Sequence, residues 1–267
     1  MSDNKSLMAG KKGLVMGVAN ERSIAWGIAQ TLHHHGAALA LTYQGGAFEK
    51  RVRPLAESLD AAIICPCDVE DAASMDATFG ALAAEWGAID FVVHAMAYSD
   101  KEELKGRYTD TTRDNFLRTV NISCFSFTDI AKRAAPLMGG GGCLLTLTYA
   151  GSERVVPNYN VMGVAKAALE ASVRYLAEDL GSAGIRVNGL SAGPMRTLAG
   201  SAIGSARSIL KWNERHSPLR RGVRLEELGG AALYLLSDLS KGVTGEILHV
   251  DSGYNIVGVP SHSQETP

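Results

Sequence analysis

The sequence predicts an α/β fold, a doubly wound parallel sheet of about seven strands with helices on both faces. Short apolar runs alternate with longer segments of helical period, and six or more strand–helix units follow one another. The runs are continuously apolar rather than alternating, which is typical of parallel strands buried on both faces. The 267 residues contain no repeat, no low-complexity segment and no composition break. We therefore expect one Rossmann-type domain over residues 1–267.

Each predicted strand is a short apolar run, and each predicted helix is a longer segment with helical spacing. In chain order we expect strand 13–19, helix 23–35, strand 38–43, helix 48–59, strand 61–68, helix 72–86, strand 89–95, helix 112–137, strand 142–148, helix 158–180, strand 185–191, helix 225–237 and strand 245–251. Gly36 ends the first helix after a polar end that holds His33, His34 and His35. Successive helical residues point in different directions, so these histidines predict no metal site.

Composition excludes several classes of function. The formal charge of −2 provides no electrostatic attraction for nucleic acid or for an anionic membrane. Residues 1–13 lack the apolar run of a signal peptide, and no segment is long enough to span a bilayer. The cysteines, at positions 65, 67, 124 and 143, have the spacing of neither a zinc site nor a Cys-x-x-Cys pair. We expect reduced thiols, no bound metal and a cytoplasmic protein.

The first strand–helix turn, "GVANERSIAWGIA", has features of a dinucleotide site although it is not Gly-x-Gly-x-x-Gly. Gly17 leaves the strand where a Cβ would crowd a pyrophosphate, and Ser23 can cap a helix whose free N–H groups face the anion. Ile24 follows Ser23 and is assigned to the same site. Gly27 is expected to let the helix pack closely on the sheet. Taken alone, this turn also fits an ordinary helix cap.

Further cofactor signals follow the next three strands. Gln44 stands where an adenosine ribose would lie and can hydrogen-bond its hydroxyl without adding positive charge. This favours NADH over NADPH, although Lys50 and Arg51 lie close in the sequence. Asp68 is expected at the adenine amino group, with Val69 against the ring. After the fourth strand, Met96 is expected near the cofactor ribose.

Tyr159 and Lys166 lie seven residues apart in the predicted helix 158–180. Residues at this spacing share one helix face, and Tyr159 lies roughly 4.5 Å further from the lysine along the axis than a residue four positions away. In an enoyl thioester, hydride adds two carbons away from the carbonyl carbon, whose oxygen gathers the negative charge. The longer spacing is therefore consistent with conjugate reduction, although the direction of the shift cannot be read from the sequence.

Several segments resemble the bacterial NADH-dependent enoyl-[acyl-carrier-protein] reductases, a divergent branch of the short-chain dehydrogenases with Tyr-x6-Lys in place of Tyr-x3-Lys. They are "GVANERSIAWGIA", "CDVED", "LTLTYAGSERVVPNYNVMGVAKAALEASVRYLA" and "IRVNGLSAGPMRTLA". The resemblance runs from about Lys11 to about Gly253. It implies an NADH-dependent reductase of enoyl thioesters held on acyl carrier protein, and a homotetramer.

The resemblance also implies roles for individual residues. Tyr159 would hydrogen-bond the thioester carbonyl and stabilise the enolate, and Lys166 would bind the nicotinamide ribose. Tyr149 would be a second active-site tyrosine, and Met162 would face the substrate where ordinary members of the superfamily carry their tyrosine. The remaining implied contacts are with the nicotinamide, from Met195, Arg196, Thr197, Leu198 and Ala199, and with the substrate, from Ser99 and Ile203.

Residues 195–215 are expected to form a flap and a helix that cover the acyl chain, and 254–267 a short C-terminal tail. Arg207, Lys211 and Arg215 recur every four residues, so they predict either a basic stripe for an acidic carrier protein or a merely solvated face. Ala206 replaces a bulky aromatic residue of well-studied members of the family. This departure predicts a more open acyl pocket.

Two other functions remain open from the sequence. An ordinary short-chain keto or alcohol dehydrogenase is one, although Met162 stands where that activity needs a proton donor, four residues before Lys166. A dinucleotide-binding protein without catalysis is the other, and the complete set of tyrosines and lysine argues against it.

Overall fold

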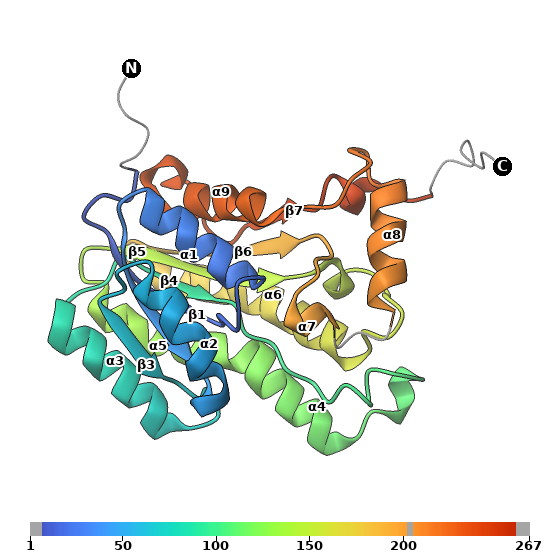
Figure 1. Ribbon diagram of the computed structural model, residues 1–267, viewed down its shortest axis with the longest axis horizontal. Coiled ribbons are helices and arrows are strands. Elements are labelled where there is room, and N and C mark those ends of the chain that lie inside the picture. Colours follow the sequence, from blue (N-terminus) through green and yellow to red (C-terminus); the bar gives the residue numbers. More distant parts are fainter. Residues whose placement is uncertain (1–6, 202–204, 260–267) are drawn as a thin grey trace.

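A computed structural model describes residues 7–201 and 205–259 of the chain. Its centre is one seven-stranded sheet in which every neighbouring pair is parallel, in the order β3-β2-β1-β4-β5-β6-β7 (Figure 1). The strands are β1 Lys12–Met16, β2 Ala38–Tyr43, β3 Ile63–Pro66, β4 Phe91–His94, β5 Gly142–Thr148, β6 Ile185–Ala192 and β7 Ile247–Val250. The predicted doubly wound sheet is confirmed. The order reverses between β1 and β4, the place where such sheets bind ligands.

The helices agree with the predicted positions except in three places, of which the first is the start of the predicted helix 48–59, which begins three residues earlier, at Gly45. They are α1 Ile24–His34, α2 Gly45–Glu57, α3 Ala72–Trp86, α4 Arg113–Val120, α5 Ser126–Ala134, α6 Val161–Gly181, α7 Leu198–Ser201, α8 Ala206–His216 and α9 Leu225–Leu236. The predicted helix 112–137 is interrupted by a π-helical turn, Asn121–Phe125. The predicted start of α6 at residue 158 is wrong, because that helix begins at Val161.

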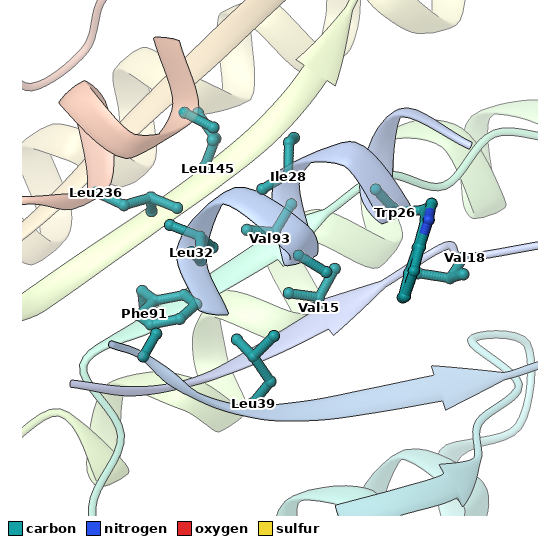
Figure 2. Packing of buried hydrophobic residues seen from close by; sticks show 14 of the residues in the cluster. Val15, Val18, Trp26, Ile28, Leu32, Leu39, Phe91, Val93, Leu145 and Leu236 are labelled. Carbon is teal, nitrogen blue, oxygen red and sulfur yellow. The ribbon is translucent and has the colours of Figure 1, made fainter. Parts of the chain in front are cut away.

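Two apolar layers cover the sheet, one on each face. In β1, Val15 packs in the layer that α1, α2 and α9 form, whereas Leu14 and Met16 pack in the layer of α3, α5 and α6. Figure 2 shows Val15, Phe91 and Val93 of the sheet beneath Ile28 and Leu32 of α1. Because successive side chains point to opposite faces, burial on both faces requires the continuous apolar runs seen in the sequence.

The closest helix–helix approach is made by two glycines. A Cβ on Gly27 of α1 would lie 2.9 Å from the Cβ of Leu225 in α9, and one on Gly229 of α9 would lie 2.1 Å from Thr31 Oγ1. The expectation that Gly27 brings α1 close to the sheet is therefore corrected. Gly27 instead brings α1 close to α9, and the two helices pack as one unit over β1 and β5 (Figure 1).

The carboxyl ends of the parallel strands meet along one edge of the sheet, and the candidate site residues follow them in the chain. Gly17 follows β1, Gln44 follows β2, and Tyr149 follows β5. α7 and α8 come after β6 and stand on the side of the molecule toward which β6 points (Figure 1). Among the helices within 7–201 and 205–259, none has the length and apolar character that crossing a bilayer requires.

Candidate active site

Two hollows adjoin at this edge of the sheet. The first, here called the cofactor groove, has a volume of about 540 Å³ and runs across the ends of β1, β2, β4 and β5. Most of the predicted cofactor-binding residues line it, namely Gly17, Ser23, Ile24, Gln44, Val69, Met96, Lys166, Thr197 and Leu198. These residues follow five different strands or lie on α6, and the fold brings them together in one groove.

The second hollow, here called the substrate cavity, has a volume of about 550 Å³. Tyr149, Tyr159 and Met162 line it on one side, and α8 contributes Ala206, Ile209 and Leu210 on another. Ser99, predicted to contact the substrate, also lines it, whereas Met195, predicted to contact the nicotinamide, lines this cavity and not the cofactor groove. Ile24, Ala97, Tyr98 and Thr197 line both hollows, so a ligand in the groove would meet a ligand in the cavity at this shared boundary.

Lys166 lies on the second turn of α6, and its side chain is almost fully buried at the floor of the groove. Its Nζ donates a hydrogen bond of 2.7 Å to the carbonyl oxygen of Leu147 in β5. An ammonium carries three N–H donors, and within the described parts of the chain the structure gives the other two no acceptor. Burial lowers the pKa of Lys166 to about 8. The residue therefore fits a partner with hydroxyl acceptors in the groove, such as a ribose.

Tyr159 is not on the helix that carries Lys166. It precedes α6 in a turn, between Asn158 at φ 62° and Asn160 at φ 40°. Asn160 tolerates this backbone because asparagine visits positive φ readily, and its Nδ2 donates to the carbonyl of Leu104 at 3.2 Å. The prediction that Tyr159 lies on the same helix face as Lys166 is therefore wrong. The turn, not the helix, aims the ring into the substrate cavity.

Tyr149 and Tyr159 form an edge-to-face pair, with ring centroids 5.2 Å apart. Burial raises the pKa of Tyr149 to about 12, and it raises the pKa of Tyr159 further. Both phenols therefore stay protonated near neutral pH. Among described residues the Tyr159 hydroxyl has no hydrogen-bond partner, so it is available to an oxygen in the cavity.

The first strand–helix turn is built differently from the prediction. The hydroxyl of Ser23 accepts hydrogen bonds from the backbone N–H groups of Ala19 and Asn20, at 3.0 and 3.1 Å, and does not cap α1. Gly17 has φ 100°, and a Cβ there would lie 2.2 Å from the carbonyl oxygen of Ala95. Gly17 is thus required by the close approach of β4 and by its own backbone. The uncapped N-terminus of α1 remains open to an anion in the groove.

At the other end of the groove, Gln44 donates to Asp68 at 3.3 Å. Asp68 also accepts from the N–H of Glu70, and it does not itself line the groove. Sequence reasoning missed Arg118, which lines the groove from α4, stacks on Tyr98 and pairs with Glu70 at 2.8 Å. No sequence motif marks Arg118, because it meets Glu70 only through the fold.

Two buried polar groups beside the site were also missed. Glu170, one turn after Lys166 on α6, accepts a hydrogen bond of 2.6 Å from Thr148, the residue before Tyr149. His94 is fully buried between Thr146 and Ser126, at 2.8 Å from each hydroxyl, and burial lowers its pKa to about 3. Ser126 Oγ donates to Ile122 O, so it accepts from a neutral His94 at the π-helical turn. The hydrogen bonds of His94 and Glu170 fix the positions of the carboxyl ends of β4 and β5.

The remaining residues predicted to contact the nicotinamide or the substrate follow β6 in the chain. Arg196 is exposed and lines a third hollow instead of the cofactor groove. Ala199 lies in α7. Ile203 lies outside the described residues. Thr197 Oγ1 accepts from the N–H of Gly200 at 2.9 Å, which fixes this residue between the groove and the cavity.

Comparisons with known proteins agree on one family. The family described as enoyl-(acyl carrier protein) reductase matches residues 17–255. Enoyl-[acyl-carrier-protein] reductase [NADH] 2 of Rhizobium meliloti (strain 1021) is 66% identical over 255 residues, 96% of this chain and 95% of the relative. The Anaplasma phagocytophilum reductase, solved in complex with NAD, is 61% identical with a TM-score of 0.93, covering 96% of this chain and 98% of that one. The Bacillus cereus reductase, solved with NADP+ and indole naphthyridinone, is 53% identical with a TM-score of 0.93, covering 95% and 100%.

Proposed function

This chain belongs to the enoyl-(acyl carrier protein) reductase family, and we propose that it reduces the trans-2 double bond of enoyl thioesters on acyl carrier protein with NADH. This is the last step of the fatty-acid elongation cycle. One observation carries the proposal. The cofactor groove and the substrate cavity share a boundary, with the Lys166 ammonium on one side of it and the Tyr159 phenol on the other.

Lys166 would hold the cofactor. Its two remaining N–H donors face the groove, and its charge favours electron-rich oxygens such as ribose hydroxyls. When bound, NADH supplies a hydride to the β-carbon of the substrate. The open N-terminus of α1, beside Gly17, would bind the pyrophosphate. Gln44 would bind the adenosine ribose, and its uncharged side chain supports NADH rather than NADPH.

Tyr159 would act on the thioester oxygen. As hydride reaches the β-carbon, negative charge gathers on this oxygen, and a protonated phenol in a dry cavity stabilises it by donating a hydrogen bond. Burial keeps the phenol protonated, because it raises the pKa of Tyr159. Tyr149, at the edge of the same ring, would position Tyr159 or shape the cavity. The enolate is then protonated at its α-carbon.

The proposal also includes a binding partner, an oligomeric state and a location in the cell. Arg207, Lys211 and Arg215 are exposed on α8, as a docking stripe for an acidic carrier protein requires. The family resemblance supports a homotetramer with closed symmetry and a cytoplasmic location. Residues 195–215 would cover the acyl chain, because α8 already forms one wall of the substrate cavity.

A reduction assay tests the reaction. The purified protein is mixed with NADH and crotonyl thioester, and separately with a β-keto thioester, and the loss of NADH absorbance is followed. We expect oxidation with the enoyl substrate. Oxidation with the keto substrate alone would establish an ordinary ketone reductase instead, which Met162 argues against because it offers no proton at the usual position. No oxidation with either would favour a non-catalytic binding protein.

A further inference from the structure

A third hollow, here called the basic hollow, lies against the substrate cavity, and two of the α8 cations proposed above for carrier-protein docking, Arg207 and Lys211, line it. Its volume is about 440 Å³, and it is lined by four cationic side chains, one carboxylate and a few apolar or small residues. The cations are Arg22, Arg196, Arg207 and Lys211, and the carboxylate belongs to Glu214. They come from the first strand–helix turn, the segment after β6 and α8.

Helix α8 forms the wall between the two hollows. Ile209 lines only the substrate cavity, whereas Arg207, Lys211 and Glu214 line only the basic hollow. Ala206 and Leu210 line both. The spacing explains this division, because residues three and four apart share a helix face. Met195 and Gly200 also line both hollows, so the two hollows adjoin at the edge of α8.

The basic hollow is separate from the cofactor groove. Within the part of the chain that the structure describes, no residue lines both hollows. The cofactor's pyrophosphate has its own place beside Gly17 and the N-terminus of α1. The cations of the basic hollow therefore point to a different anion, one that belongs to the ligand in the substrate cavity.

These cations are poorly neutralised by the protein. Arg22 meets Glu21 at 3.8 Å, with both side chains mostly exposed. Within residues 7–201 and 205–259, Arg196, Arg207 and Lys211 have no ion-pair partner, and Glu214 pairs with none of them. Four positive charges around one carboxylate repel one another, so an added anion would lower that repulsion.

We propose that the basic hollow binds the phosphate group of the phosphopantetheine arm through which the enoyl thioester is carried. This inference rests on the proposed function. The arm joins a thioester, which would sit at Tyr159 in the substrate cavity, to a phosphate group at its other end, which is a monoanionic phosphodiester on a carrier protein. An extended ligand that passes the edge formed by Ala206 and Leu210 brings its anion to Arg207 and Lys211. Arg22 and Arg196 also line the hollow and add two further positive charges.

The matched probe is a pair of substrates that differ by one group. The same trans-2-enoyl thioester is prepared on pantetheine 4′-phosphate and on pantetheine, and KM and kcat are measured for each with saturating NADH. For the parent enzyme we expect KM to be about tenfold lower for the phosphorylated substrate, with similar kcat, the size of one charge-assisted contact. Equal KM values for the two substrates would overturn the phosphate site while leaving the proposed reaction intact. Reduction of neither substrate would overturn both.

Two substitutions give effects of opposite sign. Lys211→Gln is expected to reduce the KM advantage of the phosphorylated substrate to about threefold or less, and Glu214→Gln to increase it about two- to threefold, since each changes one charge at the hollow. Lys132→Gln, on the exposed side of α5, is the matched control and should leave the KM ratio at its parental value. A KM ratio that changes equally in Lys132→Gln and Lys211→Gln would show a general charge effect and would contradict the site.

Discussion

Lys166 and Tyr159 lie in the same strand–helix connection and are both buried, but the chain holds them in opposite ways. Lys166 projects from the second turn of a 21-residue helix and is tied to β5 through Leu147. Tyr159 projects from a turn with two positive-φ asparagines, and no protein hydrogen bond among the described residues fixes its hydroxyl. The lysine is held by regular structure, and the tyrosine by irregular backbone.

This difference shows how Tyr159 and Lys166 can contact two different ligands although they are only seven residues apart in the sequence. If both groups were on the helix, any displacement of one would displace the other. With Tyr159 outside α6, its position relative to Lys166 depends on the turn and on the residues packed against its ring, so the substrate oxygen and the cofactor ribose can be contacted independently. The comparison predicts that substitutions at the two residues, and around them, will have separable effects on substrate turnover and on NADH binding.

The largest effect is expected from Tyr159→Phe. Loss of the phenol proposed to donate to the substrate oxygen should lower kcat by about 10²- to 10³-fold, the usual cost of one oxyanion donor, with little change in the Kd of NADH. Single-turnover kinetics and NADH fluorescence titration measure the two quantities. Tyr175→Phe, on the exposed face of α6, is the control and should keep the parental kcat. A tenfold weaker NADH affinity in Tyr159→Phe would contradict the separation.

Lys166→Ala should affect both quantities. The side chain contacts the groove and also ties α6 to β5, so we expect the Kd of NADH to rise about 10- to 100-fold and kcat to fall as well. Titration of NADH against the variant gives the Kd, and thermal unfolding shows whether the fold is retained. Unchanged NADH affinity in a folded variant would remove Lys166 from the cofactor site.

Gly151→Ala should displace the ring of Tyr159 without direct contact with Lys166. A Cβ at residue 151 would lie 2.4 Å from Cδ1 of Tyr159, so the ring must shift. We expect kcat to fall about tenfold while NADH affinity stays within about twofold of the parent, since a misplacement near 1 Å is already costly. Gly80→Ala is the matched control, because no atom lies within 4 Å of the added Cβ. If Gly151→Ala weakened NADH binding as much as turnover, the two groups would not be independent.

The smallest expected effect is a pH dependence on the lysine side. The pKa of Lys166 is lowered from 10.5 to about 8, so above pH 8 the buried ammonium loses its proton and NADH should bind a few-fold more weakly. Between pH 8 and 10.5 the unfolded chain binds more protons than the folded one, so Lys166 makes the free energy of unfolding rise with pH in that window. Titrations of NADH from pH 7 to about pH 9.5 test the first statement. A similar loss of affinity in Lys166→Met would assign the pH dependence to another group.

The sheet and the cofactor groove could be predicted because their signals are local. Continuous apolar runs fix the strands, and a parallel sheet then brings Gly17, Gln44 and Met96 to one edge whatever the details of the loops. The residues at strand ends therefore follow from topology. The hydrogen-bond partners of these residues do not follow from topology. The Ser23 hydroxyl, for example, accepts a hydrogen bond within its own turn and does not cap α1.

The start of α6 could not be predicted from apolar spacing, because "NYNVMG" continues the helical pattern while the backbone does not. The two asparagines beside Tyr159 were the available signal, since this residue tolerates positive φ. The interruption of the helix 112–137 has a similar origin, in hydrogen bonds of Ser126 to Ile122 and to the distant His94. The basic hollow joins residues about 190 positions apart in the chain. Only the folded structure brings them together.

The glycine contact between α1 and α9 has a consequence for synthesis in the cell. Because Gly27 and Gly229 let these helices meet, the side of α1 that faces α9 is covered only after almost the whole chain has left the ribosome. Until then this side of α1, around Gly27 and Thr31, and the part of the sheet face that α9 covers stay exposed. A chain that stops before residue 225 should therefore depend on chaperones or aggregate, even though every strand up to β6 is already present.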